Sequence, residues 1–298
     1  MSFRSGLKTV VVATDLHGQA EAAIEYARKI AGAYRARIVL AHGLDPLDYA
    51  DVHDVPEKVL EELNGQAREV LEKLSDDLLA EGIRSHSEIR QGDVAQTLVA
   101  VARDYEAGLI VLGSKGREGA GPVVVGAITE RLVRTAPCPV LAVAADWNAG
   151  PYRPTPGGPV LLAIERNEAA REAARTAYSL AETFRRPLLL LHVRTPAEAT
   201  AFLNPCSTRL EDYGIRPGGN VAVDCLIKDG DSASAILEAV LQRRPAILVI
   251  GVKRASDTPG PHGTAFTLLA RSRVPVLCVP PPPDAQRAQQ EELAAIEM

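Results

Sequence analysis

Three glycines, Gly113, Gly116 and Gly126, stand between an apolar run and a segment that could begin a helix. Glycine has no Cβ, so its backbone can come close to a ligand. The free N–H groups at the start of a helix carry partial positive charge, which suits an anion. Because a strand, a glycine loop and a helix start together are typical of phosphate binding in α/β proteins, a nucleotide is the first ligand that the sequence predicts.

The spacing of these glycines differs from two common nucleotide loops. A Walker loop needs a glycine, four residues and then Gly-Lys-Ser/Thr, and the dinucleotide fingerprint G-x-G-x-x-G is expected near the first strand. Neither pattern fits. The order found here is Gly113, two residues, Gly116, nine residues and Gly126. This order resembles the ATP-binding signature of the universal stress protein family, and the resemblance extends over nearly the whole chain to about residue 280.

The resemblance implies a role for residues outside the loop. In ATP-binding members an aspartate after the first strand contacts the adenosine part of the nucleotide, and Asp15 occupies that place, although it could instead cap the following helix. Ala127 stands where a phosphate-binding hydroxyl is expected, a loss of about 1 kcal/mol or more that Lys115 would partly return as a point charge. The implied ligand is ATP, with or without magnesium. The implied site consists of Ala13, Thr14, Asp15, Gly43 near the base, Leu112, Gly113, Lys115, Gly116, Gly126, Ala127 and Ile128.

The second half of the chain repeats the landmarks of the first half in the same order. An apolar run that ends in Glu165 matches the run that ends in Asp15, and Gly251 matches the first glycine of the signature. Arg254 stands in place of the second glycine, and the stretch from Gly251 to Gly263 is one residue shorter. A side chain where the backbone should approach phosphate disfavours ATP binding. The second loop is expected to hold a different anion or to be degenerate, and degeneration is the favoured interpretation.

Apolar runs alternate with segments of helical period in both halves. Runs that are apolar throughout indicate parallel strands covered on both faces, and right-handed crossovers then give a layered sandwich. The predicted fold class is α/β, with two repeated doubly wound parallel-sheet sandwiches of the Rossmann-like, nucleotide α-hydrolase type. Helices are expected over residues 20–33, 95–105, 169–184 and 234–243, and the first copy has the longer middle connection.

The predicted domains follow from the repeat and from a stretch rich in proline and glycine between the copies. The first domain is expected over residues 1–146, a linker over 147–158, the second domain over 159–280 and a polar tail over 281–298. The family resemblance adds that the last strand of each domain pairs between domains, which predicts a homodimer or an intramolecular pseudo-dimer.

Composition narrows the classes of function. A net charge of −5 argues against nucleic acid or anionic lipid as a general partner. No run of eighteen apolar residues is present, so no membrane association is expected and the cytoplasm is the default location. The four cysteines lack metal-like spacing, and Cys138 and Cys278 are interpreted as small buried hydrophobes. His42 and His192 are interpreted as structural, each with a ring nitrogen bonded to backbone. Neither a catalytic base nor a metal site is identified.

The leading hypothesis is an ATP-binding stress-response sensor or regulator that holds nucleotide in the first domain and hydrolyses it slowly at most. A second hypothesis is a protein that acts through dimer contacts or small metabolites without binding nucleotide, with Ala127 marking the lost phosphate contact. A third is an enzyme, for instance an ATPase or an adenylyl-transferring enzyme, because related nucleotide α-hydrolase folds do such chemistry.

Overall fold

The computed structural model describes residues 7–16, 19–45, 57–114, 125–147, 157–165, 169–194, 213, 215, 221–253 and 263–282. The chain divides into two units, with the boundary between Pro151 and Tyr152. This boundary falls inside the predicted linker, of which Trp147, Gly157 and Gly158 are described. Beyond residue 282, the predicted tail lies outside the described residues.

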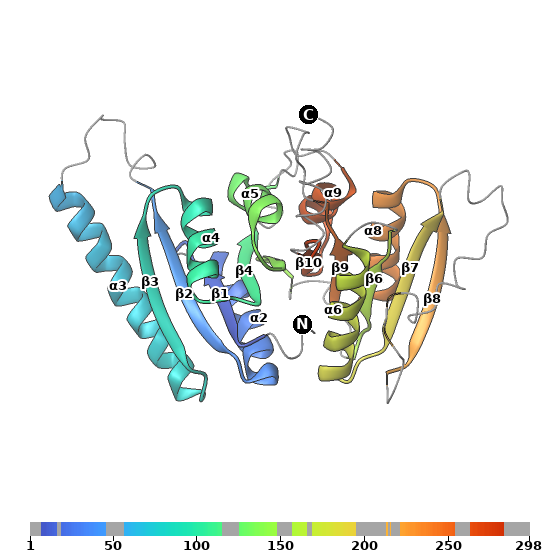
Figure 1. Cartoon of the computed structure of the whole chain (residues 1–298), viewed down its shortest axis with the longest axis horizontal. Helices are drawn as coiled ribbons and strands as arrows, with labels where there is room; N and C mark the ends of the chain where they lie inside the picture. The colour runs from blue at the N-terminus through green and yellow to red at the C-terminus, as the bar shows by residue number, and fades with distance from the viewer. Residues whose placement is uncertain are drawn as a thin grey trace, which may run out of the picture. The chain divides into compact units, whose positions relative to one another are not determined.

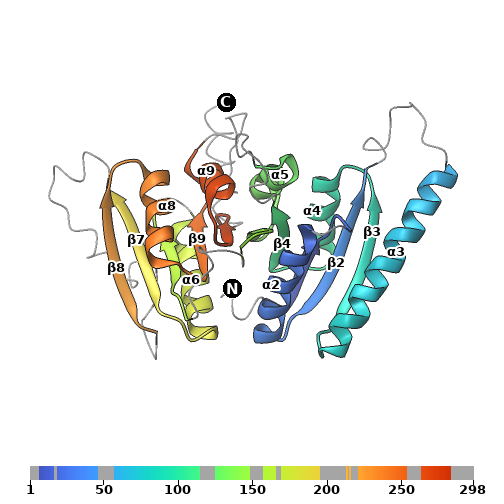
Figure 2. The same cartoon turned by 180° about the vertical axis from the view of Figure 1, so that it is seen from behind.

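The first unit is a parallel sheet with helices on both faces (Figures 1 and 2). Its strand order is β3-β2-β1-β4-β5, and each neighbouring pair is parallel. Side chains of β3 contact helices on opposite faces of the sheet. The hydroxyl of Ser85 is hydrogen-bonded to that of Ser75 in α3, whereas Glu88 accepts a hydrogen bond from Tyr105 at the end of α4. The elements are β1 (Thr9–Ala13), α2 (Gln19–Tyr34), β2 (Arg37–Leu44), α3 (Glu57–Ala80), β3 (Ser85–Gln91), α4 (Val94–Asp104), β4 (Leu109–Ser114), α5 (Ala127–Thr135) and β5 (Val140–Ala144).

The second unit repeats this topology with the order β8-β7-β6-β9-β10, again parallel throughout. Helix α6 packs on β6, β9 and β10, while α8 and α9 contact each other. Right-handed crossovers on the two sides of β6 place α6 and α8 on opposite faces of the sheet. The elements are β6 (Val160–Ala163), α6 (Ala170–Thr183), β7 (Leu188–Arg194), β8 (Val223–Asp229), α8 (Ser232–Arg243), β9 (Ile247–Gly251), α9 (Thr264–Arg271) and β10 (Val276–Val279).

The central strands are buried on both faces. Val10, Val11 and Val12 of β1 are fully buried, as are Leu161 and Leu162 of β6. Burial of consecutive strand residues requires cover on both faces, and each such side chain contributes roughly 1.5–3 kcal/mol when it leaves water. The α/β fold class predicted from the sequence is therefore confirmed.

The helices expected from apolar periodicity are present, and each begins and ends within two residues of its predicted bounds. Helix α3 differs, because the sequence indicates only a longer connection where this 24-residue helix lies. It buries a stripe that includes Ala67, Leu71 and Leu78 and packs on β3 and β2. The corresponding stretch of the second unit, between β7 and β8, lies mostly outside the described residues.

Candidate functional site

The candidate site lies where the strand order of the first sheet reverses. β2 and β3 extend from one side of β1, and β4 and β5 extend from the other. The connections after β1 and β4 therefore leave toward opposite faces, and ligands of open parallel sheets bind outside the carboxyl ends of strands at such a point. The register pairs Ala13 with Leu112 at this edge. The structure thus brings together Ala13, Thr14, Asp15, Leu112 and Gly113 of the predicted set.

A backbone turn after β1 fixes the place of Asp15. The N–H of Thr14 donates to the carbonyl of Ala41 at 3.0 Å, which extends the β1–β2 ladder. The buried Thr14 hydroxyl accepts a hydrogen bond from the N–H of Leu16 at 3.0 Å. Leu16 has a φ of 64°, and this left-handed conformation costs a residue with a Cβ roughly 1–2 kcal/mol. Asp15 is exposed, and because α2 begins at Gln19, Asp15 is not the N-cap residue of that helix.

The two strand-end histidines have the structural role that the sequence predicts. Nδ1 of His42 lies 2.9 Å from the carbonyl oxygen of Thr14, so this nitrogen carries the proton and donates it to the backbone. In the second unit, Nδ1 of His192 lies 3.4 Å from the carbonyl oxygen of Ile164 at the matching place. Both rings tie the second strand of a sheet to the turn after the first strand.

Gly43 allows a close approach between β2 and α4. A Cβ at Gly43 would lie 2.8 Å from Oγ1 of Thr97 and 3.0 Å from Cα of Val94, the first residue of α4. The second distance is to backbone, which cannot rotate away. The family resemblance predicts a place for Gly43 near the base of a nucleotide, and the structure adds that the missing side chain lets α4 begin directly against the strand.

The last glycine of the signature is the N-cap residue of α5. Gly126 has φ and ψ of −61° and 142°, an extended conformation open to any residue, and it supplies no side-chain cap. Among the described residues, a Cβ at Gly126 would meet only Oγ1 of Thr129, at an ordinary 3.9 Å. Ala127 and Ile128 follow in the first turn and are exposed. The described part of the fold therefore gives no steric reason for glycine at this position, whereas the approach of a ligand to the helix N–H groups would give one.

Two predicted site residues, Lys115 and Gly116, lie outside the described residues. The structure instead adds a pair that the sequence analysis does not identify. Asp93 is the N-cap of α4, where its Oδ1 accepts the N–H of Gln96 at 2.9 Å, and its Oδ2 forms an ion pair with Arg131 of α5. The N–H of Gln96 and the Arg131 guanidinium hold the pKa of Asp93 below its usual value. The repeated Gly-Asp dipeptide marks the N-cap in the sequence, but no sequence signal pairs it with Arg131.

The matching place in the second unit holds an ion pair. Glu165 follows β6 as Asp15 follows β1, and its Oε1 lies 3.7 Å from Nζ of Lys253, two residues beyond the end of β9. The two side chains are 70% and 69% exposed, so the pair contributes little to stability. Gly263, the N-cap of α9, has a φ of 113°, so that glycine is needed for its backbone conformation. Arg254 lies outside the described residues.

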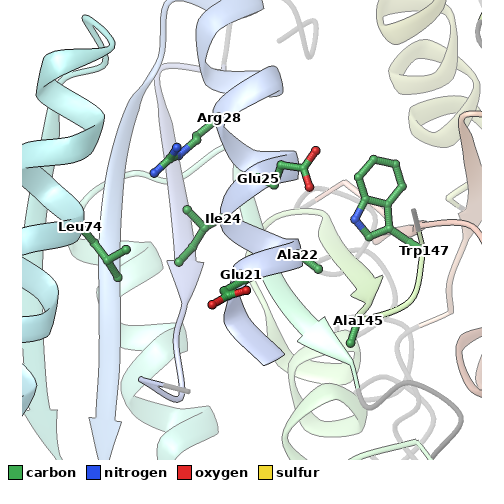
Figure 3. A pocket seen from close by; sticks show the side chains of 8 residues that line it. All are labelled: Glu21, Ala22, Ile24, Glu25, Arg28, Leu74, Ala145 and Trp147. Carbon is green, nitrogen blue, oxygen red and sulfur yellow. The ribbon is translucent and has the colours of Figure 1, made fainter. Parts of the chain in front are cut away.

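One pocket of about 380 Å³ lies elsewhere in the first unit, along α2 (Figure 3). The carboxylate of Glu25 points toward the indole of Trp147, which follows β5. Lys29 covers the Trp147 ring at 4.8 Å from its centroid and also pairs with Glu25 at 2.7 Å. None of the predicted site residues lines this pocket, whose lining consists of Glu21, Ala22, Ile24, Glu25, Arg28, Leu74, Ala145 and Trp147.

The three cysteines that the structure describes differ in exposure, and Cys225 is the exposed one. Cys138 and Cys278 are buried, as predicted, and burial raises the pKa of the Cys278 thiol to about 12. Over the described ranges, no three histidine, cysteine or acidic side chains gather in a way that could hold a metal ion. Within the same ranges, no helix combines the length and the apolar character that a membrane span requires.

Known proteins resemble this chain in sequence and in fold. Residues 6–144 match the sequence profile of the universal stress protein family. A universal stress protein of Thermus aquaticus is 32% identical over 139 residues, which cover 46% of this chain and 98% of that protein. One of Methanocaldococcus jannaschii is 29% identical over 138 residues, or 46% of this chain and 81% of that protein. The crystal structure of a universal stress protein from Archaeoglobus fulgidus shares the fold, with a TM-score of 0.74 and 19% identity over 92% of this chain and 98% of that chain.

Proposed function

The chain belongs to the universal stress protein family, and from this we propose that its first unit binds an adenine nucleotide at the carboxyl ends of β1 and β4. The observation that carries the proposal is the place of the glycine signature. Gly113 lies in β4 at the point where the strand order reverses, and Gly126 is the N-cap of α5, with no described contact that requires a glycine. Phosphates would bind between these two glycines.

Each end of the nucleotide has a counterpart in this arrangement. The exposed Asp15 would accept hydrogen bonds from the hydroxyl groups of the ribose, since a carboxylate is an acceptor with two oxygens. The N–H groups of the first turn of α5 would donate to phosphate oxygens, and the positive end of the helix dipole favours their charge. Ala127 offers no hydroxyl, which weakens the grip on the phosphates specifically.

We assign a sensing or regulatory role to this site, with slow hydrolysis at most. ATP is the proposed ligand, with or without magnesium. One nucleotide is expected per chain, because in the second unit Glu165 replaces the aspartate and is paired with Lys253. The alternative is a family member that acts through dimer contacts or a small metabolite, and the absent hydroxyl at Ala127 is the observation that favours it.

Calorimetric titration of ATP, ADP and AMP, with and without magnesium, tests the proposal. The wild type should bind one nucleotide per chain. Gly126→Val should abolish binding without unfolding the unit, because the backbone at Gly126 is extended and its Cβ position is open among the described residues. Ala127→Ser should tighten ATP binding about fivefold, the effect of one added hydrogen bond of about 1 kcal/mol.

Gly65→Ala provides a control in the same unit, because a Cβ at Gly65 meets nothing within 4 Å and α3 lies away from the switch point. It should bind nucleotide as the wild type does. Absence of binding by the wild type at millimolar nucleotide would refute the proposal and favour the alternative. A stoichiometry of two would show that the interpretation of the second unit is wrong.

A further inference from the structure

We propose that Asp93 and Arg131 form a positioning pair that holds the N-terminus of α5 in place and so sets the affinity of the nucleotide site. The inference rests on the proposed function, because it assigns the pair to the helix whose first turn would bind phosphate. Neither residue belongs to the site expected from the glycine signature. Both lie beside it, one at the start of α4 and the other in α5.

One carboxylate serves two helices. Oδ1 of Asp93 accepts a hydrogen bond from the N–H of Gln96 and so caps α4. Oδ2 accepts a hydrogen bond from the guanidinium of Arg131 in α5. Side chains in a helix lean toward its N-terminus, so the Arg131 side chain leans back over the first turn of its own helix. The residues are 38 positions apart in sequence. The pair therefore links the N-terminus of α4 to the second turn of α5, and the two helices already pack against each other.

The start of α4 is itself fixed on the sheet. Because Gly43 has no side chain, Val94 and Thr97 of α4 lie against β2 at distances that a Cβ would not allow. The Thr97 hydroxyl donates to the carbonyl of Val94 at 2.8 Å, which also holds the first turn. An unbroken series of contacts thus runs from β2 to α4, from Asp93 to Arg131, and along α5 to its N-cap at Gly126.

The second unit provides an internal comparison. Its helix α8 keeps the N-cap, because Asp231 accepts the N–H of Ser234 at 2.9 Å. When α5 and α9 are aligned on the buried Leu132 and Leu268, however, Thr267 occupies the place of Arg131.

The Thr267 hydroxyl donates to the carbonyl of Gly263 within its own helix, so it makes no link between helices there. Val193 takes the place of Gly43, and its Cβ forbids the same close approach to the strand. The aspartate N-cap is common to both units. The ion pair between α4 and α5, and the close approach of α4 to β2, are found in the first unit, which has the complete glycine signature.

The position of the N-terminus of α5 affects nucleotide affinity, because hydrogen bonds from helix N–H groups to phosphate are sensitive to distance and angle. Arg131 is 46% exposed and Asp93 33% exposed, so their pairing is of the surface kind. Loss of such a pair should raise the Kd for ATP about three- to fivefold rather than abolish binding. The proposal assigns no contact between Arg131 and the nucleotide.

A double-mutant cycle tests the pair in the full-length chain. Arg131→Gln and Asp93→Asn each remove one charge, and asparagine is as good an N-cap as aspartate, so α4 keeps its start. Each single variant should raise the Kd for ATP about three- to fivefold, and the double variant should raise it no further. Arg134→Gln is the matched control, because Arg134 is on the same helix and pairs at 3.2 Å with Glu130 of α5 itself. This control should leave the Kd unchanged.

Amide hydrogen exchange without nucleotide provides a second, independent measurement. The N–H groups of residues 130–133, which donate within α5, should exchange faster in both single variants, whereas the β1 amides should keep wild-type rates. Unchanged exchange and unchanged affinity would overturn the proposal. Weaker binding by Arg131→Gln with unchanged or tighter binding by Asp93→Asn would also overturn it, because Arg131 would then be a phosphate ligand. If the wild type bound no nucleotide, the proposed function would fail, and exchange would still decide whether the pair holds α5.

Discussion

Substitution of Gly43 by alanine should destabilise the first unit markedly. The new methyl group would lie 2.8 Å from Oγ1 of Thr97, 3.0 Å from Cα of Val94 and 3.1 Å from Cγ1 of the same valine. β2 cannot shift to relieve these contacts, because it is hydrogen-bonded in register to β1 on one side and to β3 on the other. Helix α4 must therefore move. Overpacking of this kind costs about 1–3 kcal/mol.

The single tryptophan allows the effect to be measured in the first unit. Trp147 is buried and packs edge-on against Tyr26 of α2 at 5.2 Å between ring centroids, so its fluorescence reports on this unit. With an m-value of about 2 kcal/mol per molar urea, a loss of about 2 kcal/mol shifts the urea midpoint downward by about 1 M. The Gly43→Ala variant should also bind ATP more weakly, because movement of α4 displaces Asp93.

Two helical glycines provide controls. A Cβ at Gly32 in α2 or at Gly65 in α3 meets nothing within 4 Å. Alanine there should stabilise the unit through helix propensity by up to about 1 kcal/mol, which raises the urea midpoint by up to about 0.5 M. If Gly43→Ala behaved like these controls, the close approach between β2 and α4 would be refuted. A lowered midpoint with unchanged ATP affinity would confirm the packing but refute its connection to the site.

Three further predictions concern stability and reactivity. Arg244 follows α8 with a φ of 45°, so Arg244→Gly should stabilise the second unit by about 1 kcal/mol in urea unfolding followed by circular dichroism. In a Cys206→Ser background, a thiol reagent at pH 8 should label the exposed Cys225 in the native protein and reach the buried Cys278 only after unfolding, as mass spectrometry would show. The lowered pKa of Asp93 stabilises the fold fully above the ordinary carboxyl pKa of about 3.9, and this contribution is lost as pH falls through the lower folded value. Acid unfolding of Asp93→Asn should therefore depend less steeply on pH below about 5 than that of the wild type.

The sequence predicts the elements well where one segment carries its own signal. Apolar runs such as the one ending at Ala13 give the strands, and helical period gives α2, α4, α6 and α8 to within two residues. Helix α3 is missed because the expected helices come from segments matched between the two halves, and the sequence analysis leaves this part of the first half as a longer connection. The ion pair between Asp93 and Arg131 is missed for another reason. The two residues are far apart in the sequence and are brought together by the packing of α4 on α5, which neither residue type predicts. The predicted roles of Lys115 and Gly116 stay predictions, since both residues lie outside the described ranges.

The two units share their sheet and its core, and the differences discussed here lie near one edge of that sheet. The same strand order and the same buried strands recur in both, so the fold is built twice from similar physical causes. The differences traced above, at Glu165, Val193, Lys253 and Thr267, lie at the carboxyl edge of the sheet or in the helix that begins there. The pair between Glu165 and Lys253 is mostly exposed and adds little to stability, so stability does not explain why it is there. These differences therefore support the proposal of one nucleotide per chain, because they lie at the edge of the second sheet that corresponds to the proposed nucleotide site of the first.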